Sequence, residues 1–167
     1  VCRLNPFFMK EQIAILMLAA GRASRMGQAK QLLPIQGKPM LQHCLEVALE
    51  MDAGKVLGVL GAYSDQIRKQ IYLPAVSWIE NSAWEKGLSS SIRAGIEYVT
   101  KHHPEVKGAL ILLGDQPLVS KEALEPFFDG FAKNSEGIFA ATYKGKPGVP
   151  VLFPRQYLPA LIELEGD

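Results

Sequence analysis

The segment LAAGRASRMGQAK, residues 18–30, combines small residues with closely spaced basic side chains. Gly21 carries no side chain, so the backbone there can come close to a phosphate group or a flat base. Arg25 can donate two parallel hydrogen bonds to phosphate oxygens, and Lys30 offers a movable positive charge. This pattern suits the binding of a triphosphate. The alternative is an ordinary surface connector with solvated arginines.

The spacing of this segment excludes two familiar phosphate loops that also follow a first strand. Gly21 is followed by Gly27, and Lys30 comes three residues later, so neither GxxxxGK[ST] nor GxGxxG is present. The first pattern marks P-loop NTPases and the second marks dinucleotide-binding enzymes. A redox enzyme that uses NAD(P) is therefore disfavoured.

A second candidate lies in the tetrapeptide GDQP, which directly follows the apolar run ALILL. Asp115 should then sit at the end of a buried strand. A carboxylate in that position can hold Mg²⁺, the usual partner of nucleotide phosphates, through one or two oxygens. The alternative is an aspartate that only forms a turn with Pro117.

The segment NSAWEKGLSSSIRAGI, residues 81–96, places Gly87 and three serines where a helix is expected to begin. The N–H groups at the start of a helix can bind an anion or a base edge, so this segment could complete a nucleotide pocket. Alternatively, Ser89 or Ser90 only caps the helix.

The remaining composition excludes several functional classes. Eighteen basic and seventeen acidic residues give a net charge of +1, so no global field recruits nucleic acid or an anionic membrane. The longest apolar run, from Ile13 to Ala20, is far shorter than the roughly 20 residues of a membrane span. The two cysteines have no metal-type spacing, and Ser and His share no motif, which disfavours structural zinc and covalent catalysis. We expect a reduced, soluble, cytoplasmic protein.

Short apolar runs alternate with helical patterns along the chain. The expected strands are residues 13–19, 56–61, 76–79, 109–113 and 138–143, and the expected helical stripes are Met40/Leu41/Cys44/Leu45/Ala48/Leu49, Leu88/Ile92/Ile96/Val99 and Leu124/Phe127/Phe128/Phe131. Continuous apolar strands are typical of a parallel sheet that is covered on both faces. The fold class is therefore α/β, and ligands of such folds bind beyond the carboxyl ends of the strands. The three candidate loops all lie there.

The length fits one domain. We expect residues 1–8 to form a disordered N-terminal extension and residues 9–167 to form a single domain. The last residues, LEGD, stop where a new turn begins, as in a domain truncated at its C-terminus. The final segment GVPVLFPRQYLPALIEL predicts a short strand, a proline turn and a helix.

Taken in order, LAAGRASRMGQAKQLLP, GLSSSIRAGI, LLGDQPLV and GVPVLF resemble the motifs of the MobA-like NTP transferase family, and within it the molybdenum cofactor cytidylyltransferases of the MocA type. The resemblance implies a three-layer, mostly parallel Rossmann-like nucleotidyltransferase fold. It also implies Mg²⁺, or Mn²⁺ in its place, held by Asp115, with Arg25 and Lys30 on the phosphates. The implied nucleotide-binding residues are Leu18, Ala19, Ala20, Gly21, Ser24, Arg25, Lys30, Asn81, Gly87, Ser89 and Ser90.

The same resemblance implies the substrates. LAAG and GDQP, instead of the LAGG and CDxP of guanylyl-transferring relatives, favour CTP, with molybdopterin or molybdenum cofactor as the phosphorylated acceptor. A molybdoenzyme or an insertion chaperone is the implied protein partner. Two features leave other substrates open: GVP stands where related sequences often have GHP, and only the start of a GDxGAR motif is present. The alternatives are a transferase that uses GTP or a sugar phosphate, and a non-catalytic nucleotide-binding accessory protein.

Overall fold

The computed structural model describes residues 10–22 and 28–166. The predicted extension at residues 1–8 lies outside the described residues. The strands are β1 (Ile13–Ala19), β2 (Pro34–Ile35), β3 (Lys38–Pro39), β4 (Lys55–Leu60), β5 (Val76–Glu80), β6 (Gly108–Leu113), β7 (Phe139–Tyr143) and β8 (Lys146–Pro154). The α-helices are α2 (Met40–Leu49), α3 (Ser64–Gln70), α4 (Leu88–His102), α5 (Lys121–Lys133) and α6 (Leu158–Ile162), and three 3₁₀ turns are η1 (Lys30–Leu32), η2 (Trp84–Lys86) and η3 (Arg155–Tyr157).

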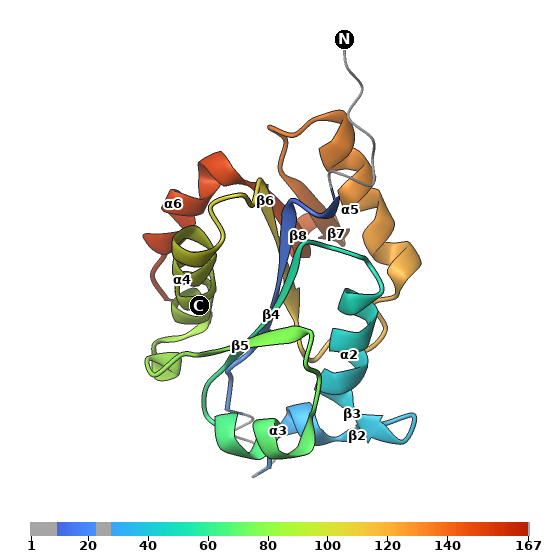
Figure 1. Cartoon of the computed structure of the whole chain (residues 1–167), viewed down its shortest axis with the longest axis vertical. Helices are drawn as coiled ribbons and strands as arrows, with labels where there is room; N and C mark the ends of the chain where they lie inside the picture. The colour runs from blue at the N-terminus through green and yellow to red at the C-terminus, as the bar shows by residue number, and fades with distance from the viewer. Residues whose placement is uncertain (1–9, 23–27, 167) are drawn as a thin grey trace.

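Six strands form one sheet in the order β5-β4-β1-β6-β8-β7, and β2 pairs with β3 apart from it. The first four strands of this order run parallel, whereas β8 pairs antiparallel with both β6 and β7. Helices α4 and α6 cover one face of the sheet, and α2 and α5 cover the other (Figure 1). The predicted α/β class and mostly parallel three-layer arrangement are confirmed.

The apolar run of β1 explains why the sheet is buried on both faces. All seven residues of β1 are buried. Ile13, Ile15 and Met17 pack into the core beneath α2 and α5, while the alternate residues of the strand pack beneath α4 and α6. Because successive side chains of a strand point to opposite faces, a strand with two covered faces has to be apolar throughout.

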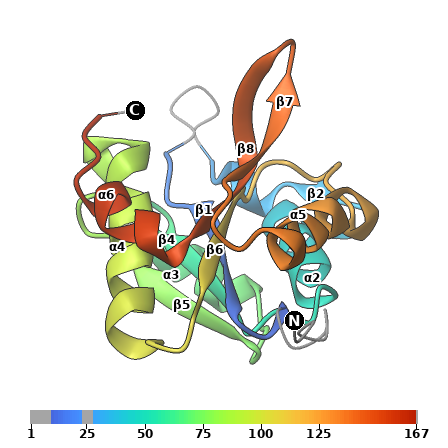
Figure 2. The same ribbon diagram turned by 90° about the horizontal axis from the view of Figure 1, so that it is seen from above.

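The edge of the sheet formed by β7 and β8 differs from the prediction, which had only a short strand in the segment GVPVLF. Strand β8 spans nine residues and forms a hairpin with β7, which projects beyond the rest of the sheet (Figure 2). The two residues that join the strands, Lys144 and Gly145, both have positive φ, as type I′ hairpin turns require. The prediction missed this hairpin because the segment carries a lysine before the glycine where the strong hairpin signal is asparagine or aspartate.

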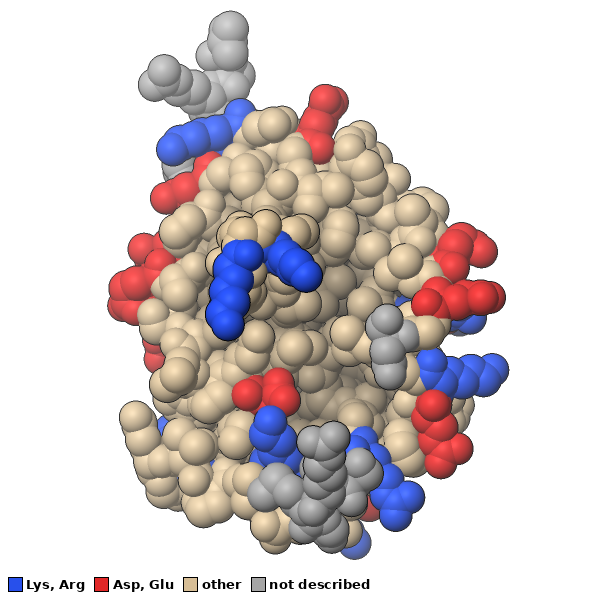
Figure 3. All heavy atoms as spheres, turned by 180° about the vertical axis from the view of Figure 1, so that it is seen from behind, with Lys and Arg blue, Asp and Glu red and all other residues tan. Residues whose placement is uncertain are grey.

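The surface carries charges of both signs. On the face opposite to that of Figure 1, basic and acidic side chains are scattered around a broad uncharged region (Figure 3). This distribution agrees with the net charge of +1. Among the described residues, no helix has the length and apolar character needed to cross a bilayer.

Candidate functional site

A cleft of about 460 Å³ opens at the carboxyl ends of β1 and β6 and reaches the start of α4. Its lining comes from four separate stretches of the chain: Leu18, Ala19, Ala20, Gly21 and Arg22; Lys30 and Gln31; Trp84, Glu85, Gly87, Leu88 and Ser91; Leu113, Gly114 and Asp115. From β1 the chain adds β4 and β5 on one side and then returns to add β6 on the other side, so the strand order reverses between β1 and β6. Such a switch point is where ligands bind in open α/β sheets.

The loop after β1 forms the floor of this cleft. Ala19 and Ala20 are buried, whereas Gly21 and Arg22 are exposed. A Cβ added at Gly21 would meet no described atom within 4 Å, and its φ is not among the positive values. The described part of the fold therefore does not require glycine at this position, although the cleft in front of it would become narrower with a side chain. Ser24 and Arg25 lie outside the described residues.

The side-chain amide of Gln31 holds the loop after β1 in place. The side chain is only 7% exposed, and Nε2 donates to the carbonyl oxygens of Ala19 and Gly21, each at 3.0 Å. Its Oε1 is buried and has no partner among the described residues. The sequence analysis did not select Gln31. A signal was present, because this glutamine is the one uncharged polar residue in a turn that continues into Leu32 and Leu33.

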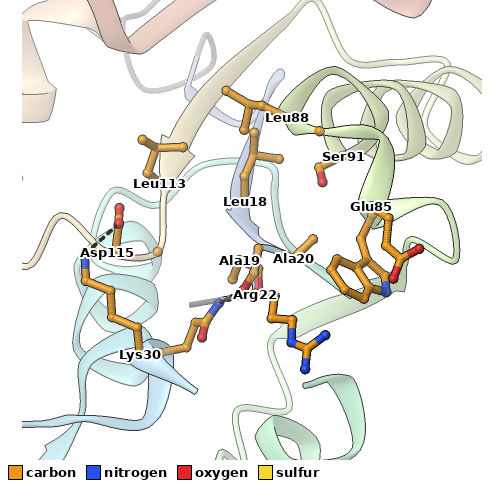
Figure 4. A pocket seen from close by; sticks show the side chains of 15 residues that line it. Leu18, Ala19, Ala20, Arg22, Lys30, Glu85, Leu88, Ser91, Leu113 and Asp115 are labelled. Carbon is orange, nitrogen blue, oxygen red and sulfur yellow. Dashed lines mark hydrogen bonds and ion pairs between the residues drawn. The ribbon is translucent and has the colours of Figure 1, made fainter. Parts of the chain in front are cut away.

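Lys30 and Asp115 meet across the cleft from the start of η1 and the end of β6. Lys30 Nζ lies 3.0 Å from Asp115 Oδ2, and the two side chains are 42% and 44% exposed (Figure 4). An ion pair with this exposure stabilises the fold by at most about 1 kcal/mol. The pair is therefore available for exchange with a ligand at little cost to the protein.

Asp115 reaches this position because Gly114 allows two loops to approach each other. The Gly114 N–H donates to the Leu18 carbonyl at 2.9 Å. A Cβ on Gly114 would lie 2.7 Å from a methyl carbon of Leu41 and 3.1 Å from the Cβ of Ala19. Neither distance leaves room for a side chain without movement of the neighbours. His43 adds support, since its Nε2 lies 3.2 Å from the Pro117 carbonyl oxygen.

The third wall of the cleft comes from the segment at the start of α4. Its serines are arranged differently from the sequence prediction. Helix α4 begins at Leu88 after Gly87, whose φ is +95°, and no side chain caps the helix. The N–H groups of Ser89 and Ser90 donate to the carbonyls of Gly166 and Gly87, so they do not point unpaired into the cleft. The alternative that Ser89 or Ser90 is the cap residue is wrong, because both lie inside the helix.

Asn81 lies behind this wall and organises it. It is 4% exposed, and its Nδ2 donates to the hydroxyl oxygens of Ser90 and Ser91 at 2.9 and 3.1 Å. Its Oδ1 accepts the N–H of Ala83 at 2.9 Å, which ties the turn before Trp84 to the helix start. Asn81, Ser89 and Ser90 are thus absent from the lining of the cleft, whereas Ser91 is part of it.

Six further residues that the sequence analysis did not select line the cleft: Arg22, Trp84, Glu85, Leu88, Leu113 and Gly114. Leu88, expected in the core stripe, is 38% exposed. Arg22 and Glu85 lie on the far side of the β1 loop from the pair of Lys30 and Asp115 (Figure 4). A carboxylate such as that of Glu85 can accept hydrogen bonds from ribose hydroxyls or an exocyclic amino group.

The donor set in the cleft fits one kind of divalent ion. Among the described residues, no three His, Cys, Asp or Glu side chains gather into a group that could enclose a metal. Asp115 supplies one half-exposed carboxylate beside an open cleft. Mg²⁺ and ions that behave similarly keep several waters and take the rest of their ligands from one or two carboxylates and substrate phosphates. Asp115 could hold such an ion together with a nucleotide.

Cys44 offers no nucleophile to this site. It is buried on α2, and burial raises its pKa to about 11, with a smaller contribution from the negative charge of Asp115. The thiol therefore stays protonated near neutral pH, and the thiolate is the reactive form.

The fold and the cleft define a Rossmann-like α/β protein with a candidate ligand site at the switch point of the sheet. A family model of the MobA-like NTP transferase domain matches residues 15–167. The chain belongs to this family.

Individual relatives agree with this assignment. The bifunctional protein GlmU of Halorhodospira halophila is 32% identical over 124 residues, which is 73% of this chain and 25% of that protein. The chain thus spans about a quarter of the length of the curated relatives it matches. The crystal structure of Rv0371c from Mycobacterium tuberculosis H37Rv is 29% identical, with a TM-score of 0.81 over 93% of this chain and 78% of that one. A structure of Rv0371c in complex with manganese is also similar, with a TM-score of 0.75 over 93% of this chain and 77% of that one.

Replacing Gly21 with alanine tests whether the open space in front of it is used by a ligand. We expect the melting temperature to stay within about 2 °C of wild type, because the added methyl group meets no described atom. We expect the affinity for a nucleoside triphosphate to fall at least about tenfold, or ~1.4 kcal/mol. Calorimetric titration with CTP measures this. Equal affinity in the folded variant would mean that the ligand does not approach Gly21.

Replacing Gln31 with leucine tests its hold on the loop. Loss of two hydrogen bonds should lower the free energy of unfolding by about 1–3 kcal/mol and raise the KM for the nucleotide more than it lowers kcat. The matched control is Gln70→Leu at the exposed end of α3, which should change neither quantity. Urea unfolding and steady-state kinetics give the two readouts. A variant with wild-type KM would limit Gln31 to a role in stability.

Proposed function

We propose that the chain transfers CMP from CTP to the phosphate of molybdopterin or molybdenum cofactor and releases pyrophosphate. The observation that carries this proposal is the single cleft in which an uncrowded small-residue loop, a lysine and one carboxylate lie together. Family membership supports nucleotidyl transfer, and the LAAG and GDQP motifs support CTP and a cofactor acceptor.

In this reaction an oxygen of the acceptor phosphate attacks the α-phosphorus of CTP in line with the leaving group. A new P–O bond forms, the bond between the α-phosphorus and the α–β bridging oxygen breaks, and the electron pair leaves with pyrophosphate. The acceptor phosphate is already ionised near pH 7, so no general base is needed. Catalysis then depends on positioning and on the neutralisation of charge.

The chain's own residues supply most of these effects. The backbone from Ala19 to Gly21, fixed by Gln31, positions the nucleotide against the floor of the cleft. Lys30 exchanges its contact with Asp115 for phosphate oxygens and, together with Arg25, stabilises the departing pyrophosphate. Asp115 holds a divalent ion, Mg²⁺ or Mn²⁺. When bound, that ion neutralises phosphate charge in the transition state.

The alternatives from the sequence differ in what they transfer. A transferase for GTP or for a sugar phosphate would use the same cleft and release pyrophosphate with a different pair of substrates. An accessory protein that only binds the nucleotide would be stabilised thermally by CTP but would release no pyrophosphate with any acceptor. A thermal-shift screen of CTP, GTP, ATP and UTP with and without Mg²⁺, followed by mass spectrometry of products, separates these cases.

Replacing Asp115 with asparagine should remove the ion and leave the fold intact. We expect pyrophosphate release with Mg²⁺ to fall at least about 100-fold, because a neutral amide binds a hard cation poorly. Binding of Mn²⁺ in the presence of CTP, measured by water-proton relaxation, should weaken in parallel. The matched control is Asp129→Asn on the exposed side of α5, which should behave as wild type. Unchanged turnover of a folded Asp115→Asn protein would rule out this role.

Replacing Arg25 with alanine tests its role on the phosphates. We expect kcat/KM for CTP to fall at least tenfold, equivalent to ~1.4 kcal/mol, because the guanidinium no longer neutralises phosphate charge. Arg68→Ala, on the exposed side of α3, is the control and should leave kcat/KM unchanged. If both variants behave alike, Arg25 does not contact the phosphates.

A further inference from the structure

The chain that follows α6 returns to the wall of the cleft. Helix α6 lies beside α4 on one face of the sheet (Figure 1). The next four residues, 163–166, then reach the first turn of α4, where the Ser89 N–H donates to the Gly166 carbonyl at 3.2 Å. The segment 163–166 is therefore attached to the helix start that forms one wall of the candidate site.

This segment is exposed along its whole length. All four of its residues are exposed, and its one large apolar side chain, Leu164, is 40% exposed. A stretch of chain without buried side chains opens easily unless hydrogen bonds hold it. The position of the segment therefore depends on the few hydrogen bonds that its backbone makes.

Arg93, in the second turn of α4, supplies two such hydrogen bonds. Its Nε donates to the Ile162 carbonyl at 2.7 Å, and its Nη2 donates to the Leu164 carbonyl at 3.0 Å. The last carbonyls of a helix have no partner within the helix, and a positive charge beside them is favourable. Helix α6 has no basic residue in its own last turn. An arginine of the neighbouring helix takes that place, with charged donors that bind more strongly than neutral ones.

The two bonds of Arg93 act on different parts of the chain. Helix α6 is already fixed on the sheet, because Leu158 and Leu161 are buried in the core cluster that α4 also covers. The bond to Ile162 completes the end of that helix. The bond to Leu164 lies beyond the helix, so it directs the exposed segment towards the start of α4.

The point of attachment matters for the cleft. Three residues at the start of α4 line the cleft, and Ser89 lies among them in the sequence. Asn81 holds two hydroxyls of this turn from one side. The Gly166 carbonyl holds the backbone of the same turn at Ser89. Both contacts limit the movement of the wall.

We propose that Arg93 is a positioning residue for the nucleotide. It fastens the segment 163–166 to the first turn of α4 and thereby sets the wall that this turn presents to the cleft. This inference rests on the proposed nucleotidyl transfer, because it takes the cleft as the nucleotide site. Arg93 itself is not part of the cleft lining. Since coupling between two sites is reciprocal, a nucleotide that contacts this wall also favours the attached segment.

Two variants test the proposal from opposite ends of the contact. Arg93→Met removes both donors and keeps a long side chain that suits a helix. Gly166→Val disfavours the attached backbone, because Gly166 has a φ of +79°, which β-branched residues rarely adopt. A Cβ at Gly166 meets no described atom within 4 Å, so this variant leaves the core intact. The matched controls are Lys101→Met, at an exposed position in the last turn of α4, and Gly145→Val, which has a φ of +76° in the β7–β8 turn.

Calorimetric titration with CTP and Mn²⁺ and steady-state kinetics give the first readout. We expect Arg93→Met and Gly166→Val each to raise the Kd and the KM for CTP at least fivefold, with kcat within twofold of wild type. A displaced wall weakens nucleotide binding, whereas the groups that neutralise the phosphates are unchanged. Both controls should bind CTP as wild type does.

Hydrogen exchange of the Ser89 amide, measured by NMR, gives a readout that a purely structural role would not move. We expect exchange to be at least tenfold faster in both variants than in wild type. CTP with Mn²⁺ should slow it at least threefold in wild type and leave it unchanged in the variants. The His103 amide, which donates to Val99 at the other end of α4, is the internal reference and should exchange alike in all ligand-free proteins.

The outcomes separate this inference from the proposed function. Absence of CTP binding by the wild type would contradict the proposed function, and the role of Arg93 with it. Normal binding of CTP by the wild type and equal binding by Gly166→Val and Arg93→Met would overturn the role of Arg93 alone. A Ser89 amide that does not respond to CTP in the wild type would also overturn it. If Arg93→Met does not fold, Gly166→Val decides the result.

Discussion

The close approach of two strand ends is the constraint on which the candidate site depends. Strands β1 and β6 are parallel neighbours with Leu18 opposite Leu113, so their chains leave the sheet at the same level. The Gly114 N–H then continues the pairing to the Leu18 carbonyl. A side chain at Gly114 would force the buried Leu41 side chain to move, since a Cβ would lie 2.7 Å from one of its methyl carbons. Without this contact, Asp115 would lie farther from the loop that carries Lys30.

Buried amide side chains fix the loops in place around that contact. Gln31 holds the carbonyls of the β1 loop, and Asn81 joins the turn before Trp84 to the start of α4. Each amide offers donors and an acceptor in one rigid plane, so one residue can satisfy the backbone of one segment and the hydroxyls of another. The positions of the cleft walls therefore depend on both residues, although Gln31 lines the cleft and Asn81 does not. Preorganisation of this kind removes ordering costs that a bound nucleotide would otherwise meet.

The sequence predicted the framework of the fold well because both faces of the sheet are covered. That burial makes strands such as β1 continuously apolar and gives α4 and α5 a helical stripe, which are strong periodic signals. The β7–β8 hairpin gave a weak signal, since β7 is largely exposed and its turn depends on backbone angles at Lys144 and Gly145. The loops of the site were visible as short polar motifs at strand ends. The sequence did not indicate which side chain of each loop faces the cleft. Ser90 and Ser91, for example, are neighbours on a helix, so their hydroxyls point in different directions and only Ser91 lines the cleft.

The change from parallel to antiparallel pairing at β8 gives the molecule a second cavity, which adjoins the cleft and shares Asp115 with it. A further parallel strand beside β6 would need a helical crossover that returns over a face of the sheet. The hairpin instead turns back at once and leaves Tyr143 and Pro150 beside the loop that begins at Asp115. The parallel half of the sheet thus builds the cleft at the carboxyl ends of β1 and β6, and the antiparallel half builds the adjoining apolar cavity. Since Asp115 is the residue that both cavities share, evolution of the hairpin can change what occupies the second cavity without altering the loop after β1 that forms the floor of the first.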